Sequence, residues 1–270
     1  MAFVRIQSTL RGADPLGAYL VVIVAAVVAL GARLLAKGRG MDKREKRQLM
    51  LLVILGVASL AVLYFTYSRS AYIGAAIAMF GAAWLSITNS QFKRRLLLAA
   101  AVLCVLFGGA VLVLRHDPAF ENTVFHTSQL SKSPKSSNAA HVIALKKGLH
   151  DVIHEPFGRG PGTAGPASTH NNHPARIAEN YFLQIGQEVG WLGLALFLAI
   201  NVLIGKQLWD RRAEDDRLPM VLFVSLLGLS VVNMLLHAWA DDTLAYIWWG
   251  MAGMATVGNI EISNRKKEKV

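Results

Sequence analysis

The sequence predicts an all-α protein, a polytopic bundle of helices that cross a membrane. Hydrophobic residues make up 54% of the 270 residues, only 17% are charged, and the mean hydropathy is +0.40. Soluble domains of this size carry a larger charged fraction. The apolar residues also fall in long runs, and about 20 such residues in sequence are enough to span a bilayer. Lipid is therefore the expected solvent for most of the chain.

Seven apolar runs have the length of a membrane span. They cover residues 17–36, 48–67, 70–88, 96–114, 181–205, 218–239 and 243–260. The last run holds Trp248 and Trp249, which suit a membrane interface. Four runs precede a long polar segment, residues 115–180, and three follow it. No internal repeat divides the chain, so we expect a single membrane domain, residues 1–270, with one large loop.

Basic residues mark one side of this predicted bundle. The net charge is +11, and most lysines and arginines fall in alternate connections, namely 33–47, 93–95, 206–217 and 265–269. Basic loops of this kind lie in the cytoplasm and suit anionic headgroups. We therefore expect a cytoplasmic carboxy terminus and an extracytoplasmic loop 115–180. Because the charges follow the loops, nucleic acid is not an expected partner.

The same topology places residues 1–16 outside, although Arg5 and Arg11 oppose their translocation. No earlier span in this chain would carry them across the membrane. We therefore expect that an amino-terminal part with further spans is missing from this sequence.

The loop contains a helix of its own. Apolar side chains recur at helical spacing within residues 139–153, with basic residues between them. This pattern predicts an amphipathic helix on the outer membrane surface. The segment from Glu155 to Gly162, with two prolines and three glycines, ends it, because proline and glycine interrupt helices.

Histidines are frequent in the same loop: His141, His150, His154, His170 and His173. His170 and His173 are three residues apart, but no third ligand follows at a recognisable interval and no zinc motif is present. We expect solvated histidines and no metal site.

Two sets of charged residues are candidates for chemistry. On the outer side the arginines are Arg5, Arg11, Arg69, Arg159 and Arg176. Arg69 is the most informative, because Ser68-Arg69-Ser70 is almost the whole connection between two spans. Its guanidinium either reaches ordinary headgroups or binds a diphosphate in a bidentate geometry.

The second set lies where the loop meets the fifth apolar run. Glu179 and Asn180 either stabilise a helix amino terminus or supply a general base, since partial burial raises a carboxyl pKa toward neutrality. Asp241 and Asp242 add acid on the same side, with His237 a turn earlier inside the sixth predicted span.

Together these segments resemble the O-antigen ligase and O-antigen polymerase family. Four places carry the likeness over nearly the whole chain: residues 5–20, Ser68-Arg69-Ser70, the stretch from Pro156 to Gly162, and Asn180 followed after nine residues by Gly190. Ligases carry a histidine before the Asn180 position, where this chain has Glu179. The chain corresponds to the carboxy-terminal half or more of a typical member.

The resemblance implies a glycosyltransferase of the bacterial cytoplasmic membrane that builds surface polysaccharide such as lipopolysaccharide. It would transfer or polymerise glycan from an undecaprenyl-diphosphate-linked donor at the outer face, without cofactor or metal. The acceptor would be a glycan, a lipid or a protein.

The resemblance also assigns roles to residues. Glu179 takes the position of the catalytic histidine, with Asn180 beside it. Arg69, with Arg5 or Arg11, would bind the diphosphate, helped by Arg159 or Arg176, and further acid, base or glycan contacts would come from His170, His173, Asp241 and Asp242.

Two alternatives remain open. A transporter or flippase for lipid-linked sugars would place charged or helix-breaking residues near the midplane, whereas spans 48–67 and 96–114 hold no charged residue. The other alternative is a truncated and catalytically silent membrane protein.

Overall fold

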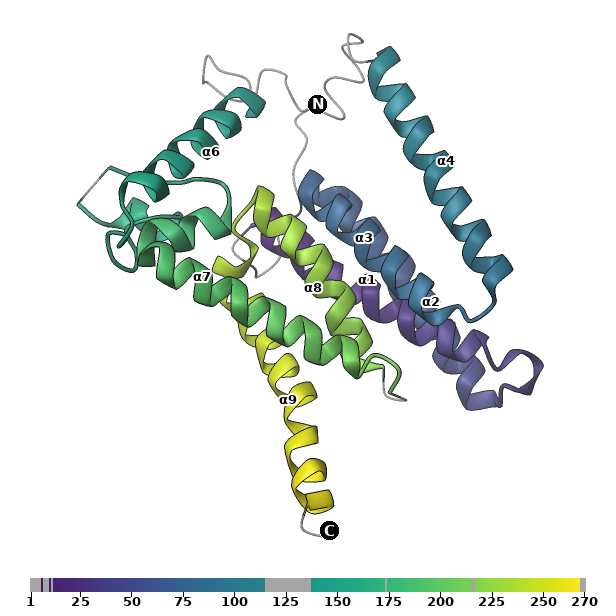
Figure 1. The fold of residues 1–270 in the computed structure, drawn as a ribbon. Helices are drawn as coiled ribbons and strands as arrows, with labels where there is room; N and C mark the ends of the chain where they lie inside the picture. The colour runs from purple at the N-terminus through teal and green to yellow at the C-terminus, as the bar shows by residue number, and fades with distance from the viewer. Residues whose placement is uncertain are drawn as a thin grey trace.

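The computed structural model describes residues 6, 10, 12–114, 137–172, 174–214 and 217–267, with side chains placed except at 137–139 and 257–267. Within these residues every regular element is a helix, as Figure 1 shows. The predicted all-α class is thereby confirmed.

Five helices are long and apolar enough to cross a membrane. They are α1 (Ala13–Leu35), α2 (Lys43–Thr66), α4 (Ser90–Leu114), α7 (Tyr181–Asp210) and α8 (Leu218–Leu235). The other two predicted positions hold α3 (Arg69–Ser86) and α9 (Asp242–Lys267). These two do not meet the length and composition criterion in the part of the chain that was described, so the count of seven spans stays a prediction.

The centre of the bundle is formed by α1, α3 and α8, which lie side by side in Figure 1. One face of α3 carries only small residues that are fully or almost fully buried, namely Ala71, Ala75, Ala78 and Ala82. Small side chains let helix backbones approach closely in a membrane. At Gly74 the approach is so close that an added Cβ would lie 2.9 Å from the Gly228 carbonyl oxygen.

Replacing Gly74 with leucine is therefore expected to push α3 away from α8 and to cost about 1–3 kcal/mol of stability, the usual range for overpacking. The matched control is Gly108→Leu on α4, where an added Cβ meets nothing within 4 Å. Thermal unfolding in detergent, followed by circular dichroism, measures the difference. Equal midpoints for the two variants would contradict this packing.

Local capping places Arg69 at the start of α3. Helix α2 ends where Tyr67 adopts a left-handed conformation, with φ of 51°, and Ser68 follows as the N-cap of α3. Arg69 is thus the first helical residue, and it is exposed.

The connection between α8 and α9 differs from the prediction. The run 218–239 was expected to be one span, but α8 ends at Leu235 and a short 3-10 turn, η4 (Ala238–Ala240), follows. The reason is Asn233, whose side-chain oxygen accepts a hydrogen bond from the Trp239 backbone N–H at 3.1 Å and closes the turn. His237 consequently lies beyond the helix, not inside a span.

One end of the bundle brings together the starts of α1, α3, α7 and α9 and the ends of α2 and α8. The backbone N–H of Tyr181, the first residue of α7, donates to the Leu236 carbonyl at 3.1 Å, just past the end of α8. At the start of α1, an added Cβ on Gly17 would lie 2.7 Å from Ala71 of α3. Asp241 caps the start of α9, because its side chain accepts from the Leu244 N–H at 3.0 Å. Arg69, Glu179, His237 and Asp241 therefore share this end, which we name the polar end.

The loop helix α6 (Ser137–His154) packs against the first turns of α7 (Figure 1). Helix α4, in contrast, has no buried residue among the described ones. The helix predicted over 139–153 and its end before Glu155 are thus confirmed. The exposed apolar side chains of α4 fit a lipid environment. The extent of the loop, residues 115–180, stays a prediction because 115–136 lie outside the described residues.

Candidate functional site

The start of α7 is fixed to the end of α8 by the residue after Glu179. The Asn180 side-chain oxygen accepts from the Leu183 N–H at 3.0 Å and so caps α7. Its amide nitrogen donates to the Met234 carbonyl at 2.9 Å. One side chain therefore caps one helix and binds the last turn of another, which fixes the position of Glu179 at the polar end.

Glu179 pairs with a histidine from the loop helix. Its Oε2 contacts Nδ1 of His141 on α6, and the two side chains are 41% and 26% exposed. The Glu179 backbone has a φ of 50°, in the left-handed region that residues with a side chain rarely adopt. Such conformations cost about 1–3 kcal/mol and often occur at functional sites. His141 was expected to be solvated, and its contact with Glu179 corrects that expectation.

His237 lies close to the same pair. Burial lowers the pKa of its imidazole to about 4, an effect that the Glu179 charge opposes and that His141 reinforces. Both ring nitrogens are buried and have no hydrogen-bond partner among the residues that the structure describes. A neutral imidazole offers one donor and one acceptor, and a buried polar group without partners is costly. The site therefore has unused hydrogen-bonding capacity beside Glu179.

The His237 pKa implies a pH-dependent stability. Since the folded-state pKa is below the ordinary value, the unfolded chain binds the proton more tightly, and stability falls as pH drops from about 6.5 toward about 4. We expect His237→Phe to flatten the fall of the thermal midpoint over this window, whereas His170→Gln at an exposed position leaves the fall unchanged. An equally steep fall in His237→Phe would contradict the assignment.

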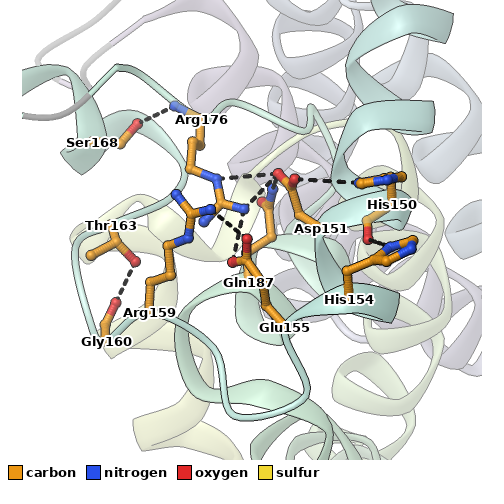
Figure 2. A network of polar contacts seen from close by, with 10 residues as sticks. All are labelled: His150, Asp151, His154, Glu155, Arg159, Gly160, Thr163, Ser168, Arg176 and Gln187. Atoms are coloured by element: carbon orange, nitrogen blue, oxygen red, sulfur yellow. Dashed lines mark hydrogen bonds and ion pairs between the residues drawn. The ribbon is translucent and has the colours of Figure 1, made fainter.

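A buried polar network holds the loop against α6 and α7 (Figure 2). Arg176 is only 7% exposed. Its Nη2 lies 2.7 Å from Oδ2 of Asp151 and 3.1 Å from Oε2 of Glu155. Gln187 of α7 donates to the same Asp151 oxygen at 2.8 Å. Burial raises the pKa of Glu155, but hydrogen bonds from Arg159 and Arg176 outweigh it and leave that pKa below its ordinary value.

A glycine contact joins the loop to a kink in α7. Gly190 has a φ of 71° within the helix, and an added Cβ would lie 2.2 Å from the Pro156 carbonyl. The freed backbone of α7 bonds the loop, because Gly160 N–H donates to the Glu188 carbonyl at 2.8 Å and Trp191 N–H to that of Pro156 at 2.8 Å. Only glycine fits this position, since it combines a positive φ with a close approach.

An apolar groove begins at Asn180. A cavity of about 910 Å³ lies between α7 and α8, with Asn180 and Met234 toward the polar end and Lys206, Trp209 and Phe223 toward the other. Its lining is mostly leucine, valine and aromatic side chains. The groove is chemically suited to an apolar chain that enters beside Glu179.

The comparison with protein families gives the same region. A family model described as O-Antigen ligase matches residues 54–198, more than half of the chain. The chain belongs to the O-antigen ligase family. The comparison with curated proteins finds no match.

The O-antigen ligase match runs from within α2 to within α7, so it includes Arg69, His141, Glu179 and Gly190. It stops before α8, so it does not include His237 and Asp241, which lie in the connection between α8 and α9. The family and the apolar helices together fit a protein of the bacterial inner membrane.

The other residues predicted for the site lie in different settings. Arg159 is exposed and pairs with Glu155, whereas Arg176 is buried in the network of Figure 2. His170 is exposed at the end of η3 (Pro166–His170), and Asp242 is exposed at the start of α9. Arg5, Arg11 and His173 lie outside the described residues. In the described part of the chain, no group of three His, Cys, Asp or Glu side chains is placed to hold a metal ion.

The contacts of three side chains in this candidate site were not predicted from the sequence: those of His141, Asp151 and Gln187. His141 lies 38 positions before Glu179, and nothing in the sequence pairs them. A signal was present for Asp151 and Gln187, because each is a polar residue within an otherwise amphipathic or apolar helix.

Proposed function

We propose that the chain is a membrane glycosyltransferase that transfers or polymerises glycan from an undecaprenyl-diphosphate-linked donor. It would act at the outer face of the bacterial cytoplasmic membrane, with the loop outside and the carboxy terminus in the cytoplasm. Family membership supports the coarse activity. The donor, the outer face and the roles of individual residues are part of the proposal.

The observation that carries this proposal is the meeting of two features at Asn180. Glu179, which pairs with His141, immediately precedes Asn180 in the chain. The apolar groove between α7 and α8 begins at Asn180. A lipid-linked sugar needs both an apolar channel for its tail and polar chemistry at its head. One residue at the membrane boundary joins these two requirements.

Arg69 is the proposed ligand of the diphosphate. It opens α3 at the polar end, where the helix amino terminus adds partial positive charge. Arg5 and Arg11 remain proposed helpers. Arg159 is exposed and remains available from the loop, whereas the two carboxylates around Arg176 favour a structural role for that side chain.

The proposed chemistry is an inverting displacement. The acceptor hydroxyl loses its proton to the acid–base pair, and its oxygen forms a bond to the anomeric carbon of the donor sugar. The bond between that carbon and the phosphate oxygen breaks, and the lipid diphosphate leaves with the electron pair. Arginine stabilises the charge that develops on the leaving group, which is the kind of electrostatic contribution that is usually largest in catalysis.

The test is transfer in proteoliposomes that contain only the purified chain, a defined lipid-linked oligosaccharide and a candidate acceptor. We expect an acceptor-dependent product by mass spectrometry together with an equal amount of free lipid diphosphate. A fluorescent donor in the same vesicles measures transbilayer movement. Movement without cleavage would support the flippase alternative and contradict the proposal, and so would the absence of both across acceptors of the glycan, lipid and protein classes.

A further inference from the structure

The loop helix presents His141 on the face that packs against α7. His141, Gly148 and Val152 are spaced by seven and four residues, so they lie on one side of α6. An added Cβ on Gly148 would lie 2.6 Å from the Ala178 Cβ. An added Cβ on Gly186 of α7 would lie 2.8 Å from a methyl group of Val152. The contacts that dock α6 therefore also bring the His141 ring to Glu179.

The contact involves a particular ring nitrogen. Glu179 Oε2 meets Nδ1 of His141, and a carboxylate accepts a hydrogen bond, so the proton belongs on Nδ1. The lone pair is then on Nε2. The same arrangement of carboxylate, Nδ1–H and basic Nε2 activates hydroxyl groups in other enzymes, where the carboxylate holds the ring in the correct tautomer.

A second imidazole completes a place for a hydroxyl group. His237 lies near this pair with both ring nitrogens buried and without partners. An alcohol is both donor and acceptor, so its hydrogen-bonding groups complement a basic Nε2 and a neutral imidazole. Glu179 is the more exposed of the two side chains, but its Oε2 already accepts the Nδ1–H hydrogen bond, so the lone pair on Nε2 is the base offered to such a group.

The geometry points to His141 Nε2 as the catalytic base, with Glu179 as the positioning residue that orients it. This assignment rests on the proposed glycosyl transfer and deepens it. The acceptor O–H proton moves to Nε2 while the oxygen bonds to the anomeric carbon and the diphosphate leaves. The imidazolium formed beside Glu179 then returns its proton to water.

The activity test uses His141→Ala in the proteoliposome assay. We expect kcat to fall by about 10²–10⁴-fold, the usual contribution of a general base, and added imidazole to restore part of it. Matched control His154→Ala removes an exposed histidine from the same helix and should retain wild-type turnover. The exchanged pair, His141→Glu with Glu179→His, should be more active than either single change, because it restores a carboxylate beside an imidazole. Histidine also tolerates the left-handed backbone at position 179 better than most residues.

Wild-type turnover in His141→Ala, or a loss that imidazole leaves unchanged, would overturn the assignment. A second measurement needs no substrate, so it separates failure of this inference from failure of the proposed function. In ¹⁵N-histidine spectra of the chain in nanodiscs, with His141→Gln identifying the signal, we expect the Nδ1–H tautomer and its loss in Glu179→Gln. An Nε2–H tautomer in the wild-type chain would overturn the inference even if the chain proves inactive.

Discussion

Methionine in place of Arg176 is expected to lower the stability of the chain by about 3–5 kcal/mol, the cost of removing one partner from a buried ion pair. The Arg176 guanidinium is the cation between Asp151 and Glu155. The Arg176 backbone N–H donates to the Ser168 hydroxyl at 3.0 Å, a bond that the substitution retains. Without the guanidinium, two carboxylates remain close together in a largely buried site. Methionine keeps an unbranched apolar stem but lacks the guanidinium, so the loss measures the guanidinium's charge together with its hydrogen bonds to Asp151 and Glu155.

Arg159→Met is the matched control for this change. Among the described residues Arg159 forms an ion pair with Glu155 and with no other carboxylate, and its side chain is 54% exposed, so its removal should cost at most about 1 kcal/mol. Thermal unfolding in detergent gives the stability, and limited proteolysis reports whether the loop from Glu155 to Ala178 has come away from α6. If both variants unfold at the same temperature, the network of Figure 2 does not hold the loop.

Glutamine in place of Glu179 is expected to reduce glycan transfer by about 10²–10⁴-fold while the chain remains folded. The amide has the size of the carboxylate, but it carries no charge to stabilise an imidazolium at His141. The loss follows whether Glu179 takes the proton itself or positions His141. The measurement is initial rate of product formation, with the thermal midpoint as a check on folding.

Glu214→Gln serves as the control for that variant. Glu214 pairs with Arg211 at the far end of α7, away from the polar end, and its change should leave the rate unaltered. Full transfer by Glu179→Gln would remove the Glu179 and His141 pair from the chemistry.

The helices could be predicted from sequence because each depends on a local pattern. The apolar runs correspond to helices at every predicted position, and the spacing within 139–153 gave α6. The end of α8 could not be predicted in this way, since it depends on the bond from Trp239 to the Asn233 side chain. The count of membrane spans is also harder to predict, because α3 is short and begins with an arginine.

The site was less predictable because its contacts join distant parts of the chain. Glu179 and Gly190 were predicted from the spacing that the family resemblance implies, and the structure gives a physical reason for the glycine in its positive φ and its contact with Pro156. The partners of Arg176 lie 21 and 25 positions away, so sequence grouped this residue with the exposed arginines. The meeting of His141, Glu179 and His237 requires three separate elements to pack together.

The most direct test of a glycosyl-transfer site at the polar end is to map a bound donor. A lipid-linked oligosaccharide with a photoreactive group on its first sugar is crosslinked to the chain in proteoliposomes, and labelled peptides are identified by mass spectrometry. We predict labelling of peptides that contain Arg69, His141 or Glu179, and competition by unlabelled donor. Labelling confined to the opposite end of the bundle, at residues 37–47 or 206–217, would contradict the account.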